Sequence, residues 1–152
     1  MFKQILYYST SLIVRLSTKR HFMILIFTFA IISNECIAQH SKQLSEIRPS
    51  AEFSNIHVIP LFSDSLSSSF VIWVKIEVKP HKHVFHSEQI YVLEGSGEMK
   101  LGNKTFLINR GDYVFIPKNT VHSVITKSTN PLKVLSIQSP KFEGKDRVMV
   151  NN

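Results

Sequence analysis

Two short stretches of the sequence contain the side chains best suited to chemistry, and the first of them runs from His81 to Glu88. His81 and His83 are two residues apart, so in a strand they point to the same face, roughly 6.6–6.8 Å apart along the chain. Two imidazoles at that spacing can converge on one cation. Glu88 follows five residues after His83, which leaves room for the chain to turn and offer a carboxylate from an adjacent strand. Alone, a His-x-His pair on a strand is weak evidence for metal binding, because most such pairs are exposed or hydrogen-bonded histidines.

The second stretch runs from Gly111 to His122 and suggests a turn, a buried strand, a turn marked by Pro117, and a histidine that opens another strand. A lone histidine there would usually be structural. Taken together, the two stretches resemble the two motifs of the cupin superfamily, and the resemblance covers about residues 70–138. The matching positions, with the family's spacing between them, are His81, His83, Glu88, Gly95, Gly111, Pro117, Asn119, His122 and Thr126.

Two positions depart from the family pattern. Asn119 stands where the family has glycine, and asparagine is the other residue that best tolerates the left-handed region. Thr126 stands where the family has an asparagine that does not bind the metal. Neither departure touches a ligand position.

The resemblance implies one divalent metal ion held by His81, His83, Glu88 and His122 inside a double-stranded β-helix, or jelly-roll barrel. Three neutral nitrogens and one carboxylate leave positive charge on such an ion, and an octahedral ion would keep free coordination sites. Fe, Mn, Zn, Ni and Cu all suit these ligands, so ligand type does not identify the metal. Glu88 is also a candidate base.

The elements around these motifs are predicted to be strands. From residue 70 onward the hydrophobic period is two, which predicts one half-buried strand over 70–78. Gly102-Asn103 predicts a two-residue hairpin turn, and helical periodicity is lacking. These patterns predict an all-β sandwich or barrel, and the resemblance implies that it is a cupin barrel over 69–140. An arm over 39–68 with a short strand near 56–61 precedes it, and a tail over 141–152 follows it. Further strands are predicted over 89–93, 97–101, 104–109, 113–116, 122–126 and 132–138.

Several other side chains are interpreted structurally. His86 lies in the spacer between two ligand positions and is predicted to sit in a turn at the barrel mouth without binding metal. Arg110 and Arg147 are the arginines of the strand-rich part, but a turn and a tail position give neither a clear role as a substrate anchor. The remaining interpretations are His40 and His57 as bystanders in the arm, Tyr113 and Phe115 as core or wall, and Asn103 as a turn residue instead of a glycosylation site.

Residues 1–38 are predicted to be a secretory leader that precedes the barrel. Lys19 and Arg20 precede an apolar run over 22–32, and Ala38 fits the last position before cleavage. The alternative is a retained membrane anchor, but the run is shorter than the ~20 residues that a membrane span needs. Cleavage would leave 39–152 without cysteine, since Cys36 is the single cysteine of the chain. This favours a periplasmic or secreted protein.

The net charge of +7 does not indicate nucleic-acid binding. The leader accounts for +3 of it, and the other charges are scattered, with no basic block. We therefore expect a small-molecule ligand or substrate as partner, no nucleic acid, no stable membrane span after leader removal and, by resemblance, a homodimer. The predicted activity is oxygenase- or isomerase-type chemistry on a small oxygen-rich molecule. The alternative is a non-catalytic cupin that binds a sugar or small acid, with the metal structural or absent.

Overall fold

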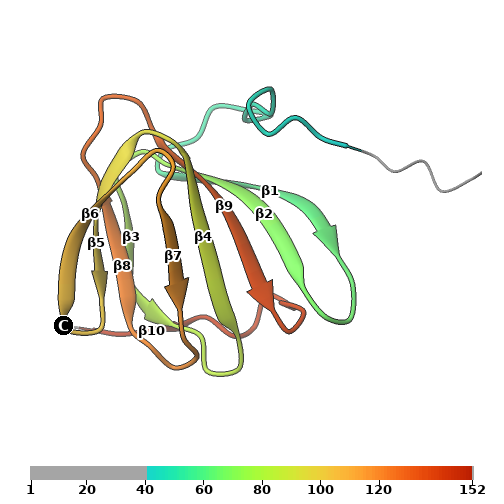
Figure 1. The fold of residues 1–152 in the computed structure, drawn as a ribbon, viewed down its shortest axis with the longest axis vertical. Helices are drawn as coiled ribbons and strands as arrows, with labels where there is room; N and C mark the ends of the chain where they lie inside the picture. The colour runs from blue at the N-terminus through green and yellow to red at the C-terminus, as the bar shows by residue number, and fades with distance from the viewer. Residues whose placement is uncertain (1–40, 152) are drawn as a thin grey trace, which may run out of the picture. The chain divides into compact units, whose positions relative to one another are not determined.

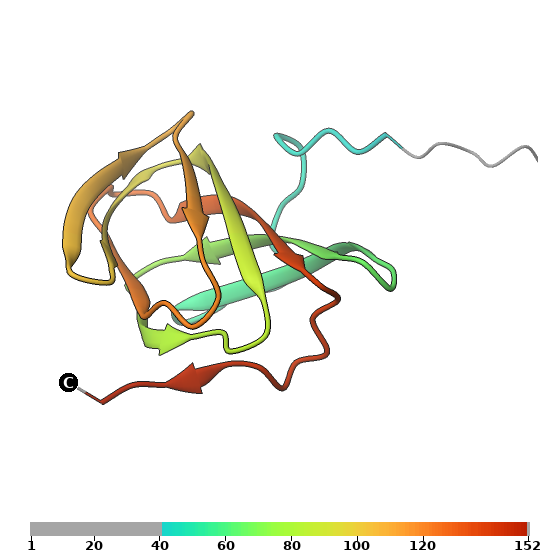
Figure 2. The same cartoon turned by 60° about the horizontal axis from the view of Figure 1, so that its bottom comes forward.

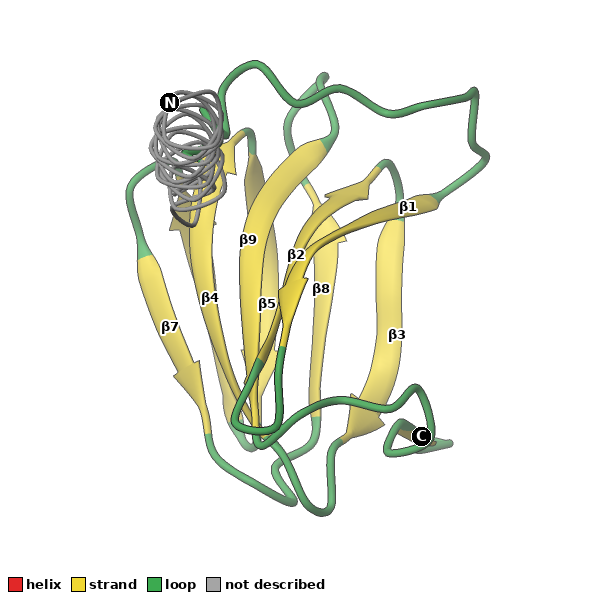
Figure 3. Ribbon diagram, turned by 90° about the vertical axis from the view of Figure 1, so that its right-hand side faces the viewer, coloured by secondary structure: helices red, strands yellow, loops and turns green. Residues whose placement is uncertain are grey.

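A computed structural model describes residues 41–151, and the predicted leader and His40 lie outside these residues. The chain divides into two compact units, Met1–Lys42 and Gln43–Asn152, and the fold below is that of the second unit. Its described residues form strands, turns and loops (Figure 3). Within 41–151 there is no helix with the length and hydrophobicity that a membrane crossing requires.

The strands form two five-stranded antiparallel sheets that face each other (Figure 1). One sheet has the order β1-β2-β9-β4-β7 and the other has the order β10-β3-β8-β5-β6. This is the predicted all-β barrel. The strands are β1 (Ile56–Ser63), β2 (Ser68–Val74), β3 (Glu77–Lys82), β4 (Ser87–Glu94), β5 (Ser96–Leu101), β6 (Lys104–Asn109), β7 (Tyr113–Ile116), β8 (His122–Thr126), β9 (Leu132–Ser139) and β10 (Val148–Met149).

Alternating side chains from both sheets fill the space between them. Successive residues of a strand point to opposite faces, so every second residue of β4 and β7 faces the core. Val114 and Ile116 are buried in this way, whereas Tyr113 and Phe115 point outward and are 59% and 51% exposed. The prediction that Tyr113 and Phe115 belong to the core or wall is therefore wrong, because β7 is an edge strand whose outer face is uncovered.

The predicted single strand over 70–78 is two strands in different sheets. The chain bends at Lys75 and Ile76, between β2 and β3. Asn55 holds this corner: its side chain accepts from the backbone N–H groups of Ile76 and Glu77 and donates to the carbonyl of Glu77. The alternation of residue types continues through the bend, which is why periodicity alone missed it.

The arm before β1 covers the outer face of the first sheet through a buried lysine. The Lys133 amine, on β9, donates to the backbone carbonyls of Leu44 and Ile47 and pairs with Glu94 at 2.9 Å. It also lies 5.4 Å from the ring centre of Trp73 on β2. Every donor position of this ammonium group is thereby used, which is the condition for burying a charge without a large cost. Lys133 is thus one of the polar anchors that join the arm to the sheet.

Two turns and the C-terminal segment prepare the functional site. Gly102 has a φ of +56° in the predicted hairpin turn between β5 and β6, and Asn119 has a φ of +59° before β8. Asn119 thus adopts the left-handed conformation that the family's glycine position requires. The predicted tail contains β10, which pairs with β3 through Val148 opposite Lys82 and Met149 opposite His81. Figure 2 shows this segment crossing one end of the barrel.

Candidate metal centre

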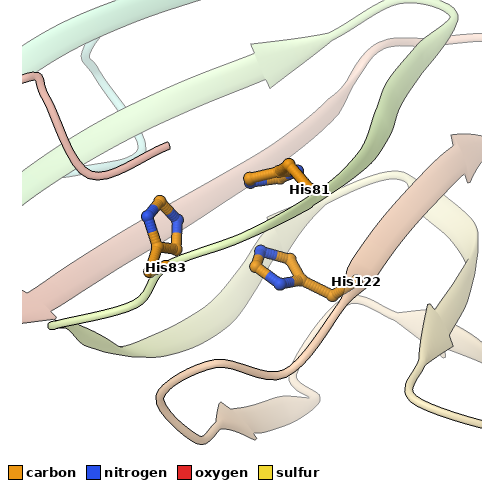
Figure 4. Close-up of side chains that lie close together, drawn as sticks. All are labelled: His81, His83 and His122. Atoms are coloured by element: carbon orange, nitrogen blue, oxygen red, sulfur yellow. The ribbon is translucent and has the colours of Figure 1, made fainter. Parts of the chain in front are cut away.

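Three histidines from two neighbouring strands converge inside one end of the barrel. His81 lies on β3 directly opposite His122, the first residue of β8. His83 follows one residue after the end of β3. One nitrogen of each ring lies within 4.8 Å of the corresponding nitrogen of the other two, and all three side chains are buried. Figure 4 shows the three rings turned toward one another.

Each of the three rings is oriented by a backbone carbonyl on its outer side. Nδ1 of His81 is 2.9 Å from the carbonyl of Lys79, and Nδ1 of His122 is 3.0 Å from the carbonyl of Thr120. Nδ1 of His83 is 2.6 Å from the carbonyl of Asp146. A carbonyl can only accept, so Nδ1 carries the proton and Nε2 keeps its lone pair. Three lone pairs therefore face one small volume, which is the arrangement that metal-binding imidazoles adopt.

Glu88 supplies a carboxylate to the same volume from β4. Its Oε2 lies 3.6 Å from Nε2 of His83 and 3.3 Å from Nε2 of His122. Its other oxygen accepts from the Ser136 hydroxyl and from the Gln138 amide on β9. One carboxylate oxygen is thus held by the sheet, and the other is directed at the histidines.

The electrostatics of the site favour a neutral His81 ring beside an ionised Glu88 carboxylate. Burial, together with the neighbouring His122, lowers the pKa of His81 to about 3. Burial alone would raise the pKa of Glu88, but its contacts with His122, His83 and Ser136 outweigh burial and hold that pKa below its ordinary range. For His83, burial is outweighed by Glu88 and by the carbonyl of Asp146, which raise its pKa.

One specific observation supports the fit of these residues to a divalent metal ion. Nε2 of His122 is buried and has no hydrogen-bond partner in the part of the chain described here, because its contact with Glu88 lacks hydrogen-bond geometry. A buried nitrogen lone pair without a donor is costly, and a cation shared by the other two rings and the carboxylate would satisfy it. The donor set suits a borderline metal that accepts both nitrogen and oxygen ligands.

Comparison with known proteins identifies the family. The cupin domain model matches residues 70–138, the segment that carries both motifs. An uncharacterized protein of Aquifex aeolicus is 37% identical over 112 residues, which covers 72% of this chain and 91% of that protein. The chain belongs to the cupin superfamily.

Other relatives agree with this assignment at the level of the fold. A mannose-1-phosphate guanylyltransferase of Salmonella muenchen is 30% identical over 117 residues, covering 73% of this cupin but only 23% of that enzyme. A Klebsiella pneumoniae protein with a double-stranded β-helix domain superposes with a TM-score of 0.62 at 18% identity, covering 75% of this cupin and 99% of that chain.

The segment after β9 supports the metal centre in a way that the sequence did not reveal. Asp146 is buried, with only 7% of the residue exposed. It accepts the backbone N–H groups of Val84, Phe85 and His86 and the Nδ1–H of His86. The other ring nitrogen of His86 contacts the carbonyl of Lys141. The structure therefore places His86 in the loop between β3 and β4, in keeping with the predicted turn, and both ring nitrogens contact Asp146 and Lys141.

His57 lies apart from this cluster. Its ring packs between Phe53 and Trp73 on the outer side of the first sheet, with ring centres 5.5 and 5.9 Å away. The sequence interpretation of His57 as a bystander agrees with this position.

A cavity of about 170 Å³ opens beside the four predicted ligands. Its walls are mostly aliphatic, and Ile72, Val78 and Met99 are among the residues that line it. Gln138 and Arg147 also line it, and sequence analysis assigned neither to the site. Gln138 had a detectable signal, since it continues the inward face of β9 where an apolar residue would be expected. Arg147 had none, because the pairing of β10 with β3 is tertiary.

Proposed function

We propose that this cupin is an exported protein that holds one divalent metal ion through His81, His83, Glu88 and His122 and acts on a small oxygen-rich molecule at that ion. The observation that carries the proposal is the common orientation of the three histidines. Each ring gives its Nδ1–H to a backbone carbonyl and keeps Nε2 for the shared volume. A bound metal would supply Lewis acidity or redox chemistry to a substrate oxygen.

The chain's own residues account for substrate orientation and proton handling. Aliphatic side chains make up most of the wall next to the ligands, and charge interactions are stronger in such surroundings than in water. Glu88 is the candidate base, because its Oε2 accepts no hydrogen bond from Ser136 or Gln138 and would be available to a proton once it left the metal. This chemistry fits an oxygenase or an isomerase. Fe, Mn, Zn, Ni or Cu would serve as the ion.

A non-catalytic cupin that binds a sugar or small acid is the second candidate. The apolar character of the cavity favours it, since among the lining residues Glu88 is the one carboxylate, and it already contacts two histidines. Turnover separates the two candidates, because both predict binding.

The proposal is tested by metal content. The full chain, recovered after expression and after reconstitution with each of the five metals, is expected to hold about one equivalent of metal. His83→Ala and His122→Ala are each expected to lose most of it, while His57→Gln, a histidine variant on the outer side of the sheet, keeps it. Unchanged occupancy in both ligand variants would overturn the assigned site. Dioxygen uptake and isomerisation screens on the loaded protein then test for turnover.

Export and self-association are further parts of the proposal. The leader motif supports cleavage after Ala38 and a periplasmic or secreted location. The resemblance to small cupins supports a homodimer, and the exposed aromatic side chains of β7 offer apolar surface at a sheet edge. N-terminal sequencing of the mature protein and light scattering in solution test these two points.

A further inference from the structure

Two polar groups in the cavity wall are not used to hold the four predicted metal ligands. One is the amide oxygen of Gln138, and the other is the guanidinium of Arg147. They come from β9 and from the segment between Asp146 and β10, so the fold brings them to one cavity from separate elements.

The Gln138 amide has a defined orientation. Its Nε2 lies 3.4 Å from Oε1 of Glu88, and an exchanged amide would set two acceptors against each other. Oε1 of Gln138 is therefore the atom left over. It is buried and, among the described residues, has no hydrogen-bond partner. Gln138 is only 6% exposed, so this acceptor is largely shut off from bulk water. A ligand hydroxyl that donates a hydrogen bond would satisfy this acceptor.

Arg147 is fixed from both sides. The residue before it, Asp146, binds three successive backbone N–H groups of the β3–β4 loop, and the residue after it, Val148, pairs with Lys82 on β3. The Arg147 side chain therefore starts beside the end of β3 and lines the cavity, while the residue as a whole is exposed. Burial lowers the pKa of Arg147, and the negative charge of Glu88 opposes that effect.

The charges in the cavity favour an anion at Arg147. Among the lining residues, Glu88 is the one acidic side chain, and it contacts His83 and His122 in preference to Arg147. A planar guanidinium is the group best matched to a carboxylate, which it binds through two parallel hydrogen bonds. The aliphatic walls of the cavity would then contact an apolar substituent of the bound carboxylic acid.

We infer that Gln138 and Arg147 form a ligand subsite for a 2-hydroxy acid, with the carboxylate on Arg147 and the hydroxyl on Gln138. This inference rests on the proposed function, because it places the hydroxyl next to the predicted metal ligands. It narrows the substrate class from any oxygen-rich molecule to small 2-hydroxy acids with an apolar side chain. Both residues are binding residues in this assignment.

The test is calorimetric titration of the Zn²⁺-loaded full chain with three matched probes. Mandelate carries both groups, phenylacetate lacks the hydroxyl, and 1-phenylethane-1,2-diol lacks the carboxylate. We expect mandelate to bind at least about tenfold more tightly than either of the others. Arg147→Gln is expected to lose that advantage over the diol, and Gln138→Leu the advantage over phenylacetate. Arg110→Gln, a variant of an exposed arginine in the β6–β7 turn, is the matched control and is expected to bind mandelate like the wild type.

The outcomes separate this inference from the proposed function. Zinc content is measured on every sample, and each titration is repeated after chelation. Full zinc content with equal affinity for mandelate and the diol would overturn the subsite while leaving the metal site intact. Equal loss of mandelate affinity in Arg147→Gln and Arg110→Gln would also overturn it. Absence of zinc in the wild type would overturn the proposed function, and the probe series on the chelated protein would still decide whether Arg147 selects the carboxylate.

Discussion

Replacing Asp146 with asparagine is expected to destabilise the protein in a manner that depends on pH. The carboxylate accepts three backbone N–H groups of the β3–β4 loop and the ring N–H of His86. Burial alone would raise the pKa of Asp146, but these hydrogen bonds outweigh it and lower the pKa from 3.8 to about 2. At about 1.4 kcal/mol per pKa unit, folding favours the ionised carboxylate over a neutral group by about 2–3 kcal/mol.

The sign of the pH dependence follows from the direction of this pKa change. A carboxylate whose folded pKa is depressed contributes its full stability above the unfolded pKa and loses it as the pH falls through the folded pKa. The free-energy difference between wild type and Asp146→Asn should therefore be about 2–3 kcal/mol at pH 6, about half of that near pH 3, and small near pH 2.

Urea denaturation of both metal-free proteins at several pH values measures this difference. Asp112→Asn is a suitable control, because the Asp112 carboxylate accepts one backbone N–H in an exposed turn. A difference below about 0.5 kcal/mol at pH 6, or one that stays constant down to pH 3, would refute the assignment of a buried carboxylate that anchors the loop.

Three further predictions concern other parts of the fold. Lys133→Met removes the donor shared by the carbonyls of Leu44 and Ile47 and should lower the free energy of unfolding by about 1–3 kcal/mol in urea denaturation. The control is Lys127→Met, which removes an exposed ion pair, and an equal loss of stability in both variants would contradict the prediction. Asn119→Ala should cost about 1–2 kcal/mol and Asn119→Gly much less, because the φ of this residue is +59°; equal costs would exclude backbone strain as the reason. The metal-free protein should lose stability as the pH falls from about 6.5 toward about 3, because unfolded His81 takes up a proton that folded His81 refuses; an equally steep loss in His81→Gln would refute that cause.

The sequence predicted what depends on local pattern. Seven of the strands follow from alternation and turn residues, since β4 to β9 and β1 lie over the predicted ranges. The convergence of His81, His83 and His122 was predicted from the family resemblance. The hydrogen bonds that orient His81 and His122 join residues only two positions apart in the chain, so they too depend on local structure.

What escaped prediction depends on contacts between residues far apart in the sequence. The bend at Lys75 and Ile76 is set by Asn55, about twenty residues earlier in the chain. Asp146 and Arg147 acquire their roles because β10 pairs with β3, and a two-residue strand has no periodicity to detect. The exposure of Tyr113 depends on β7 being an edge strand, which is a property of the whole sheet.

X-ray absorption spectroscopy at the edge of the bound metal tests the central claim most directly. The claim is that three imidazole nitrogens and one carboxylate hold the ion, with each ring bound through Nε2 because Nδ1 donates to a backbone carbonyl. For the Zn²⁺-loaded full chain, the account predicts a nitrogen and oxygen shell with the outer scattering of about three imidazoles, and about two in His122→Ala. Imidazole scattering that is absent, or that is unchanged in His122→Ala, would contradict the account.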